Sequence, residues 1–582
     1  MSRNLAEDSY SMKTALGALA LVALAGSSHA FAPPPPGRQP DSGPGLSPAE
    51  PVEIDGRLVF PDGAPVPRSL TEAERRYLER HPLQAPEGLR GPGGPTPPTG
   101  PVWCVPEYAP MDGLCLSWEG GSALTAIVAQ IAAKITNQGG GRAYIAIDSN
   151  SLIPSATTTL NTYGTNMSNV TWVVRPMDTI WIRDYGPRYI LEGNCRAIVD
   201  HIYNRPRPND NTHPIAFGNL KKHAVYALSL IHGGGNYHLS GLGDSYATQL
   251  IVNENPSLSQ LQIHDLWQSY QNVDTTIVQP FPTSVDATQH IDMWMQIIGD
   301  REVVISDWPM NVGSIQDTIC DNTAAAMAAD GYTVHRVVAR SVNGTHYTYT
   351  NVVMFNDILL IPTYTNTSVA PHNAEALALW QTACPDKQIF QINCQAIVTL
   401  AGVMHCIVMH VPVAPGGDIP TAYLKSLRGG ESLTPGAVTP VKWLADDNVG
   451  VSGVDVLLSY DAGATFPVTL ASNIPHTGTY NWTVPDRFSR NVRVKVVARD
   501  LAGNSGFDAS PASFTINGTC QGDWNGDGLV TTSDVSGFLT QWFSDLSGGT
   551  TLADFDGNGA TNTSDVTGFL SAWFANIAAG GC

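Results

Sequence analysis

The amino-acid sequence predicts a multidomain fold: a large α/β domain, an all-β sandwich and a small helical module, in that order. From about residue 102 to 412, short β-branched runs alternate with segments of helical spacing. Residues 418–517 carry period-2 runs between Gly, Asp and Asn turns, and residues 518–582 hold an internal repeat. A chain of 582 residues agrees with several domains, because single cores rarely grow beyond ~250–300 residues.

Composition narrows the classes of partner. The formal net charge is −20, from 51 acidic against 31 basic residues, and 43% of the residues are hydrophobic. Nucleic acid and anionic membrane surfaces do not attract so acidic a chain. The hydrophobic content is ample for folded cores. We therefore expect no nucleic-acid partner. No segment after the first thirty residues is long and apolar enough for a membrane helix, so we also expect no membrane span.

Residues 1–30 have the pattern of a signal peptide. Met12 and Lys13 precede an apolar stretch from Ala15 to Ala25, and small residues up to Ala30 offer a cleavage site. The apolar stretch is shorter than the ~20 residues that a membrane helix needs. We expect the protein to be exported, either secreted or at the cell surface.

Residues 31–101 are rich in proline and glycine, from Pro33–Pro36 to Gly91–Pro98. Such a stretch does not bury enough apolar surface to fold, so we expect a linker or a pro-segment. One helix is expected within it, with Thr71 as the N-cap residue before an acidic first turn.

Four β-branched runs and one helical segment illustrate the pattern of the α/β domain, residues 102–412. The expected strands are 170–174, 197–203, 303–306 and 358–361, and the expected helix covers 126–135. In residues 418–517, strands are expected at 441–444, 454–460, 480–484 and 492–497. About 100 residues of this texture predict a β-sandwich of the immunoglobulin type, acting as a spacer or positioning module.

The C-terminal repeat predicts calcium binding. Two runs, 523–534 and 554–565, place oxygen ligands at positions 1, 3, 5 and 12 of a calcium loop, with aspartate in place of the final glutamate. The expected ligands are Asp523, Asn525, Asp527, Leu529, Thr531 and Asp534, then Asp554, Asp556, Asn558, Ala560, Asn562 and Asp565. An apolar stripe follows each loop, at 535–543 and 566–574, and predicts two packed helices. The unit resembles a dockerin-type module, which implies calcium-dependent attachment to a cohesin-like or cell-surface partner.

Nine cysteines in an exported chain tend to pair, and an odd count leaves one thiol over. The pairs Cys104/Cys115, Cys384/Cys394, Cys195/Cys320 and Cys520/Cys582 would leave Cys406 free, although sequence does not fix the connectivity. Cys406 lies in an apolar run of the kind that forms a buried strand. A structural buried thiol is the alternative interpretation.

Three polar islands interrupt the apolar pattern of the α/β domain. One contains Asp184, which we expect at the end of a strand. The second contains His290 and Asp292, two apart and so on one face of an extended strand, and the third contains Cys406. Two carboxylates facing one pocket repel each other unless a cation lies between them, and a planar guanidinium matches paired carboxylates well. The islands therefore predict a thiol set against a guanidinium carbon.

Five pieces of this domain carry a family resemblance. They are Trp181-Ile-Arg-Asp-Tyr-Gly-Pro187, Gly233-Gly-Gly-Asn236, His290-Ile-Asp292, Tyr349-Thr-Asn351 and His405-Cys406. In this order they resemble the bacterial peptidylarginine deiminase and agmatine deiminase family, and the domain order resembles its secreted Porphyromonas-type branch. The resemblance implies a five-bladed pseudosymmetric α/β propeller, of the pentein type, and catalysis without metal or organic cofactor.

The resemblance also implies roles for individual residues. Cys406 attacks the guanidinium carbon through a covalent thiouronium intermediate, and Asp184 and Asp292 hold the guanidinium nitrogens. His290 acts as general acid and then as general base, and Asn351 orients the cysteine region. The implied reaction converts peptidyl-arginine to citrulline and ammonia.

Residues expected to bind the rest of the substrate are Arg205, Arg207, Trp181 and Asn236. A proline between Arg205 and Arg207 enforces extended geometry, so both side chains face roughly one way. By the same resemblance, this run clamps the α-carboxylate of a C-terminal arginine, and Trp181 stacks along the substrate's aliphatic stem. The alternative for both arginines is structural pairing with Asp200 or Asp210.

Three alternative functions remain open from sequence. The first is an agmatine deiminase or another small-guanidine hydrolase, against which export and the two arginines argue. The second is a cysteine protease with Cys406, His290 and Asn351, which leaves both aspartates unexplained. The third is a non-catalytic, calcium-dependent surface attachment protein.

Overall fold

The computed structural model describes residues 46–61, 63–83, 96–527 and 529–581. The expected signal peptide, residues 1–30, lies outside the described residues. Among the helices that are described, none has both the length and the apolar character of a membrane span.

Five sheets of three or four strands build residues 102–412. In each of them, two antiparallel strands are followed by a strand parallel to the second, with one or more helices in the connection. The final strand of the domain, β21, pairs with the early strand β4 and so closes the ring, with Met409 opposite Cys115. The predicted five-bladed α/β propeller is confirmed for this part of the chain.

The strands of the five sheets have the following bounds. The first sheet contains β21 (Met409–Pro412), β4 (Met111–Ser117), β5 (Arg142–Ile147) and β6 (Val170–Val174); the second contains β3 (Val102–Cys104), β7 (Arg188–Glu192), β8 (Cys195–Tyr203) and β9 (Ala224–His232). The other three are β10 (His238–Leu239), β11 (Asp244–Thr248) and β12 (Asp274–Val278); β13 (Met295–Gly299), β14 (Glu302–Asp307) and β15 (Thr333–Val338); and β18 (Val353–Phe355), β19 (Ile358–Thr363) and β20 (Gln388–Asn393).

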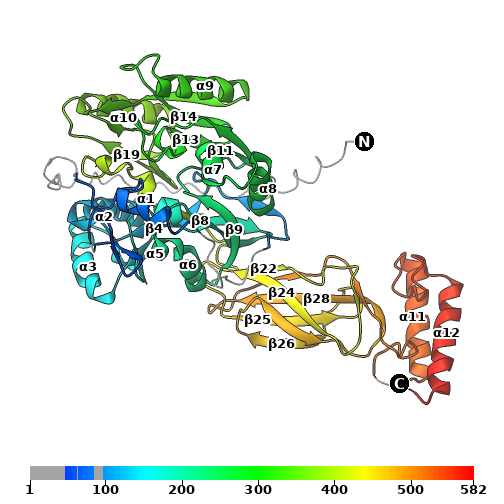
Figure 1. Ribbon diagram of the computed structural model, residues 1–582. Helices are drawn as coiled ribbons and strands as arrows, with labels where there is room; N and C mark the ends of the chain where they lie inside the picture. The colour runs from blue at the N-terminus through cyan, green and yellow to red at the C-terminus, as the bar shows by residue number, and fades with distance from the viewer. Residues whose placement is uncertain (1–45, 62, 84–95, 528, 582) are drawn as a thin grey trace, which may run out of the picture. The chain divides into compact units, whose positions relative to one another are not determined.

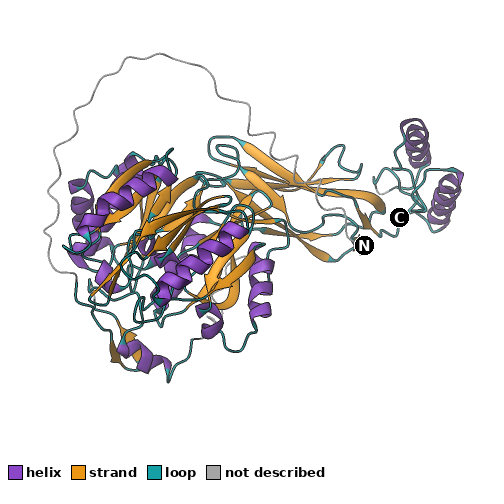
Figure 2. Cartoon of the chain, turned by 90° about the horizontal axis from the view of Figure 1, so that it is seen from above, coloured by secondary structure: helices purple, strands orange, loops and turns teal. Residues whose placement is uncertain are grey.

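Helices lie on the outside of the five sheets (Figures 1 and 2). The longer ones are α2 (Gly121–Asn137), α3 (Ile153–Thr162), α6 (His213–Lys221), α8 (Gln260–Gln271), α9 (Ile315–Ala329) and α10 (Asn373–Ala383). The buried face of α2 follows its helical spacing, with Leu124, Ile127, Ile131 and Ile135 in the core. The four strands and the helix expected in this domain are all present.

Residues 46–83 are folded, so the expectation of an unfolded linker is wrong here. They form a hairpin, β1 (Val52–Ile54) with β2 (Arg57–Val59), and a helix, α1 (Glu72–Leu78). Thr71 caps α1 as predicted, in a capping box with Glu74. Contacts with the propeller hold the segment, including the buried Arg207–Glu74 ion pair and the packing of Leu46 on the propeller core, and composition does not reveal them.

Two sheets form the predicted β-sandwich between residues 418 and 517. One contains β22 (Thr421–Leu424), β24 (Val438–Asp446) and β27 (Thr479–Thr483); the other contains β23 (Ser432–Leu433), β30 (Phe514–Ile516), β28 (Ser489–Arg499), β25 (Gly453–Ser459) and β26 (Val468–Ile474), with β29 (Ser505–Ala509) beside β28. Trp443, Trp482 and Phe514 contribute to the core between the sheets.

The C-terminal repeat forms two helices, α11 (Thr532–Gly548) and α12 (Thr563–Ala578). Phe538 and Phe569, one from each apolar stripe, stack with ring centroids 4.3 Å apart. The predicted helix pair is present, although Phe543 and Phe574 at the ends of the stripes are exposed.

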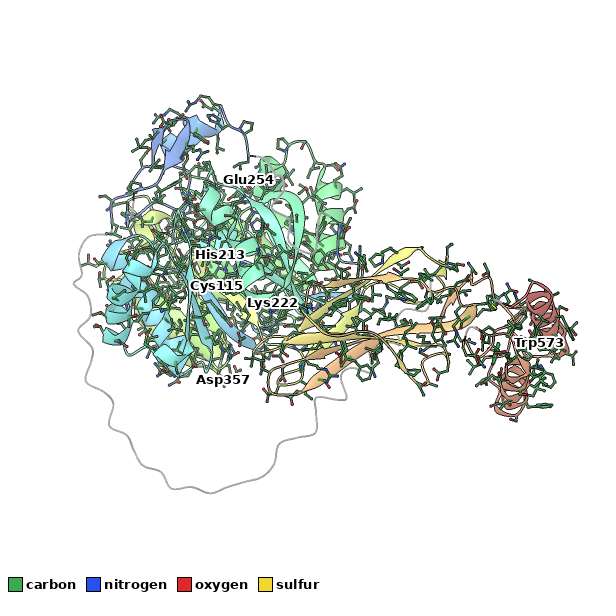
Figure 3. The ribbon with its side chains drawn as sticks, turned by 90° about the horizontal axis from the view of Figure 1, so that it is seen from below. Cys115, His213, Lys222, Glu254, Asp357 and Trp573 are labelled. Carbon is green, nitrogen blue, oxygen red and sulfur yellow. The ribbon has the colours of Figure 1, made fainter. Side chains whose placement is uncertain are left out.

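The expected disulfides within the α/β domain are absent. Cys104, Cys115, Cys195, Cys320, Cys384, Cys394 and Cys406 are all free and buried (Figure 3 labels Cys115). Cys384 and Cys394 flank β20, whose six residues span ~20 Å. A disulfide requires Cα atoms within ~7 Å, so proximity in sequence misleads here. Cys520 is disulfide-bonded, and its expected partner, Cys582, lies outside the described residues.

Candidate active site

In each propeller blade a short turn precedes one of the strands, and these turns carry the predicted site residues. Asp184 lies in α4 (Ile182–Tyr185) before β7, and Asn236 lies just before β10. Asp292 lies in the 3-10 turn η3 (Ile291–Met293) before β13. Asn351 lies just before β18, and Cys406 lies in the 3-10 turn η6 (His405–Ile407) before β21.

The local structure expected for four site residues is wrong. Asp184 was expected at a strand end, His290 and Asp292 on an extended strand, and Cys406 within a strand. All four lie in or beside single helical turns. Apolar neighbours such as Ile407 and Val408 are buried by the propeller core, so their hydrophobicity does not indicate a strand.

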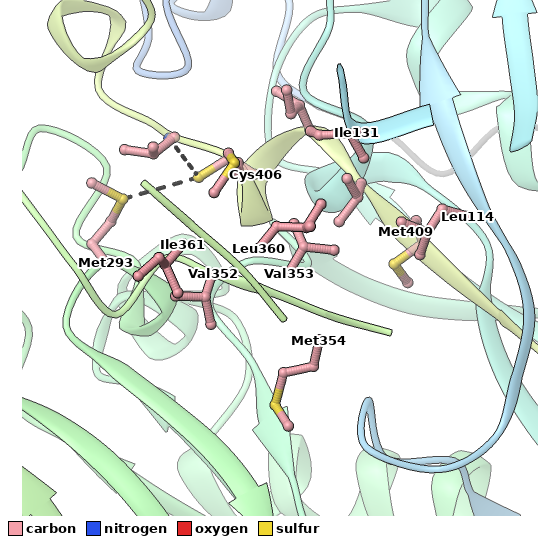
Figure 4. Packing of buried hydrophobic residues seen from close by; sticks show 14 of the residues in the cluster. Leu114, Ile131, Met293, Val352, Val353, Met354, Leu360, Ile361, Cys406 and Met409 are labelled. Atoms are coloured by element: carbon pink, nitrogen blue, oxygen red, sulfur yellow. Dashed lines mark hydrogen bonds between the residues drawn. The ribbon is translucent and has the colours of Figure 1, made fainter. Parts of the chain in front are cut away.

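The structure brings Cys406 and Asn351 into direct contact (Figure 4 shows Cys406 in its apolar surroundings). The Asn351 Nδ2 donates to the Cys406 Sγ at 3.2 Å, and the Asn351 Oδ1 accepts from the His405 backbone N–H at 3.0 Å. The backbone N–H of Val403 also points at the sulfur, 3.4 Å away. These donors favour the thiolate form of Cys406.

A guanidinium from the protein itself fills the site, and it belongs to Arg68. Asp184 accepts from Arg68 Nε at 2.9 Å and from Nη2 at 2.8 Å. Asp292 accepts from Nη1 and from Nη2, each at 3.0 Å. The Cys406 Sγ lies 2.7 Å from Nη1. The site therefore holds a guanidinium with two bidentate carboxylates and a thiol, all buried.

Charge pairing sets the ionisation of the two carboxylates. Burial alone would raise the pKa of Asp184, but the Arg68 guanidinium and His290 hold it well below its usual value. Burial would also raise the pKa of Asp292, but the charges of Arg68 and His405 lower it below its usual value. Burial raises the pKa of the Cys406 thiol well above its usual value, against the opposing effect of Arg68. Both carboxylates are thus ionised beside a neutral thiol.

His290 is placed to transfer protons. Its Nδ1 lies 3.4 Å from the Asp184 Oδ1, and neither ring nitrogen makes a hydrogen bond to the described residues. Burial, with the nearby Arg68 charge, lowers the pKa of His290. A neutral imidazole whose ring nitrogens make no hydrogen bond is suited to accept a proton and return it.

Two glycines give the guanidinium its space. The Gly235 backbone N–H donates to the Asp184 Oδ1 at 3.0 Å, and a Cβ at this position would lie 1.8 Å from Arg68 Nη2. A Cβ at Gly402 would lie 2.5 Å from Trp181 Cζ3 and 3.1 Å from Arg68 Cδ. Any side chain at either glycine would therefore obstruct an arginine in the site.

Trp181 contacts the segment that carries Arg68, whereas Asn236 forms its hydrogen bonds within the propeller. The Trp181 Nε1 donates to the backbone carbonyl of Val66 at 2.9 Å, two residues before Arg68. The Asn236 Oδ1 accepts from the backbone N–H groups of Thr248 and Ile291, at 3.0 and 3.3 Å. Asn236 thus supports the turn that carries Asp292, and its hydrogen bonds are made within the propeller.

Arg205 and Arg207 both face the segment that carries Arg68. The Arg205 Nε donates to the backbone carbonyl of Arg68 at 3.1 Å. Arg207 forms a buried ion pair with Glu74, with Nε 2.7 Å from Oε1, and its Nη2 donates to the Pro67 carbonyl at 2.8 Å. The alternative pairing with Asp200 or Asp210 is not seen in the described part of the chain.

Sequence reasoning did not identify Arg68, His405 or Glu107 as parts of the site. His405 bridges two carboxylates, with Nδ1 2.9 Å from the Asp292 Oδ2 and Nε2 3.0 Å from Glu107. Its position next to Cys406 in the quoted motif was an available signal. Arg68 lies in a proline-rich run without periodicity, so no local pattern marked it.

The two C-terminal loops have the donor chemistry of a calcium site. Oxygens of Asp554, Asp556 and Asp565 lie within 4.8 Å of one another. In the first loop, the Asp534 Oδ1 accepts from the Asn525 backbone N–H at 3.1 Å, which draws both ends of the loop together. Hard oxygen donors of this kind suit Ca²⁺. Gly528, at position 6 of the first loop, lies outside the described residues.

Comparisons with known proteins point in one direction. Residues 105–412 match the model of a family described as Porphyromonas-type peptidyl-arginine deiminase. A protein named "Putative agmatine deiminase" from Shewanella baltica is 25% identical over 291 residues, covering 42% of this chain and 76% of the relative. One of the same name from Marinomonas sp. is 24% identical over 281 residues, covering 41% and 74%.

One solved structure agrees with the fold, and a second match is of similar extent. A crystal structure described as a putative agmatine deiminase superposes with a TM-score of 0.50 at 18% identity, covering 55% of this chain and 98% of that one. The agmatine deiminase of Enterococcus faecalis gives a TM-score of 0.49 at 19% identity, covering 56% and 99%.

Proposed function

The chain belongs to the Porphyromonas-type peptidyl-arginine deiminase family, and on this premise we propose that it hydrolyses the guanidinium of a C-terminal peptidyl-arginine to citrulline and ammonia. The observation that carries the proposal is the grip of Asp184 and Asp292 on the Arg68 guanidinium beside Cys406. Arg68 stands in for the arginine of a substrate.

The proposed reaction uses the thiol, the imidazole and one water. The Cys406 thiol gives its proton to His290, the resulting thiolate attacks the guanidinium carbon, and the bond from that carbon to the terminal nitrogen breaks. His290 protonates the departing ammonia, which leaves a thiouronium on Cys406. His290 then accepts a proton from water as the water attacks the same carbon, and the carbon–sulfur bond breaks. The products are a ureido group, ammonia and free Cys406.

Main-chain contacts favour a peptide over agmatine. The Arg68 backbone N–H donates to the Leu400 carbonyl at 2.9 Å, and the Arg68 carbonyl accepts from Arg205. Agmatine has no carbonyl to accept from Arg205. A hydrogen bond to a charged group contributes ~1.5–3 kcal/mol, so this difference favours peptidyl substrates.

The charge of Arg205 and Arg207 favours a C-terminal arginine. With residues 46–83 in place, the buried Glu74 carboxylate neutralises Arg207. In a site that holds a substrate instead, Arg205 would face the backbone carbonyl of the bound arginine and Arg207 the carbonyl of the residue before it. Arg205 also lies 3.8 Å from the Glu254 carboxylate, so Arg207 is the guanidinium that loses its partner when Glu74 leaves. A terminal α-carboxylate would restore a negative charge to this end of the site and balance Arg207, whereas an internal peptide bond brings no charge, and a buried unpaired charge is costly.

The remaining parts of the proposal concern location. The expected signal peptide supports export, and we propose that the C-terminal loops bind Ca²⁺ and present a dockerin-like helix pair to a cohesin-like or cell-surface partner. The β-sandwich, which we propose to be of the immunoglobulin type, would serve as a spacer. No step of the proposed reaction requires a metal.

The test compares citrulline or carbamoyl product released from three compounds: a peptide ending in arginine, its C-terminal amide, and agmatine. The protein carries Arg68→Ala, so that the site is accessible, and the control adds Cys406→Ser. We expect the free-acid peptide to be preferred and the control to be inactive. Preference for the amide or for agmatine would contradict the carboxylate clamp, and no product from any compound would contradict the deiminase assignment.

A further inference from the structure

The strongest unexplained feature is that residues 46–83 place their own arginine in the guanidinium site. We infer that this segment is an inhibitor in cis, with Arg68 as a pseudosubstrate, and that the deiminase is latent until the segment leaves. The inference rests on the proposed function for its account of latency. That Arg68 occupies the guanidinium site does not depend on which substrate the enzyme uses.

Arg68 excludes any other guanidinium completely. Its side chain is fully buried, as are Asp292 and Cys406. All four oxygens of Asp184 and Asp292 accept from Arg68. A substrate arginine would need the same oxygens, so the two occupants compete for one site.

The thiol contact suggests why Arg68 is held and not hydrolysed. The guanidinium is planar and its N–H bonds lie in that plane. Nη1 donates to the Cys406 Sγ, so the sulfur lies toward the edge of the group. Attack on the carbon requires approach from its face. The contact therefore ties up the sulfur as a hydrogen-bond acceptor in a geometry that is unsuited to bond formation.

The backbone on both sides of Arg68 is fixed by the propeller. Trp181 binds the Val66 carbonyl, Arg207 binds the Pro67 carbonyl and Arg205 binds the Arg68 carbonyl. Each of these three propeller side chains is one that the sequence analysis assigned to substrate binding. The segment thus occupies the peptide subsites as well as the guanidinium site.

The helix α1 locks the segment in place. Glu74 closes the capping box with Thr71 and also forms the buried ion pair with Arg207. Although burial raises it, Arg207 holds the pKa of Glu74 below its usual value. A cavity of about 360 Å³ lies beside this lock, lined by Ser69 and Arg75 of the segment and by Asp286 and His346 of the propeller. Space at this edge would allow the segment to move without rearrangement of the blades.

The test uses the full chain as wild type, Arg68→Ala and the control Arg75→Ala, whose side chain is exposed on α1. Two rates are measured: alkylation of Cys406 by iodoacetamide, read by peptide mass spectrometry, and citrulline release from a peptide ending in arginine. Because a tethered occupant has an effective concentration of ~mM, we expect both rates to rise by tenfold or more in Arg68→Ala. We expect Arg75→Ala to match wild type.

The outcomes separate latency from function. Equal alkylation rates in wild type and Arg68→Ala, with equal citrulline release, would overturn the latency and leave the deiminase assignment standing. Faster alkylation without citrulline from any variant would uphold the occupancy and contradict the proposed function. The mass of the wild-type peptide that contains Arg68 is a further check, since conversion of Arg68 to citrulline would show a substrate and overturn the pseudosubstrate.

Two further measurements test the inference even if the Arg68→Ala protein does not fold. Glu74→Gln breaks the ion pair with Arg207 and leaves Arg68 intact, and we expect it to raise the same two rates. A synthetic peptide of residues 63–83 should inhibit the opened enzyme competitively, and the same peptide with citrulline at position 68 should not. Equal inhibition by both peptides would overturn the role of the guanidinium.

Discussion

The amide of Asn351 donates to the Cys406 Sγ at 3.2 Å, although the two residues are 55 positions apart in the chain. The same amide group accepts from the His405 backbone, so one side chain fixes both the sulfur and the turn that carries it. Asn351 and Cys406 each precede the first strand of a blade. Their contact is therefore a consequence of closing the propeller.

Asn351→Ala should lower kcat more than it raises KM, measured in the Arg68→Ala background. The lost hydrogen bond favours the thiolate, and hydrogen bonds to charged groups contribute ~1.5–3 kcal/mol, which corresponds to a loss of about tenfold to a hundredfold. Asn351→Gln should restore little, because the amide would move. An unchanged kcat with raised KM would contradict a role beside the sulfur.

Asp292→Asn should reduce kcat/KM for the arginine peptide by about thirtyfold or more. Removal of one partner of a buried charge pair costs ~2–5 kcal/mol, and Asp292 contacts two guanidinium nitrogens. Steady-state kinetics with Asp386→Asn, an exposed carboxylate, provides the control. A decrease of similar size in both variants would point to a general charge effect.

Asp200 should make the stability of the protein depend on pH. Burial raises the pKa of Asp200 to about 8, above the unfolded value of ~3.9. Its contribution to stability is therefore fully present below about pH 4 and is lost as the pH rises toward about 8, by up to ~1.4 kcal/mol per pH unit. Thermal unfolding of Asp200→Asn across this window should be less pH-dependent than that of wild type. Parallel profiles for the two proteins would contradict the raised pKa.

Arg205→Ala should narrow the preference for peptides over agmatine. The substitution removes the donor that contacts the carbonyl of the bound arginine, so kcat/KM for the free-acid peptide should fall by about tenfold or more. The value for agmatine should change much less. An equal fall for both compounds would show that Arg205 supports the fold of the site and not its specificity.

Each C-terminal loop should bind one Ca²⁺ ion. Chelation should lower the helical signal of α11 and α12, since ligand binding stabilises the folded form. In calorimetric titrations, Asp556→Asn should weaken binding in the second loop, while the first loop serves as the internal control. No heat of binding in the wild-type chain would contradict a calcium site.

Residue chemistry made much of the active site predictable. Paired carboxylates, an imidazole and a thiol were recognised from their types, and the structure brings Asp184, Asp292, His290, Asn351 and Cys406 together. Their local structure was not predictable, because Ile407 and Val408 are apolar through burial in the propeller and not through strand periodicity.

The odd number of cysteines was not a valid reason to single out Cys406. The proline-rich segment contains a site residue, Arg68, that its composition does not indicate. Seven cysteines of the α/β domain are free, so Cys406 is distinguished by Asn351 and Arg68 and not by an odd count. Arg68 reaches Asp292 across 224 positions of sequence. Only the closed propeller creates the pocket that holds it, so no local property of residues 66–69 predicts its place.

The most direct test of the central claim is acid-quench mass spectrometry of the Arg68→Ala protein during turnover of a peptide ending in arginine. A covalent adduct on Cys406, with the mass of the substrate less ammonia, is the predicted result, and it should be absent from Cys406→Ser. Citrulline formation without this adduct, or with an adduct on another residue, would contradict attack by Cys406 on a guanidinium held by Asp184 and Asp292.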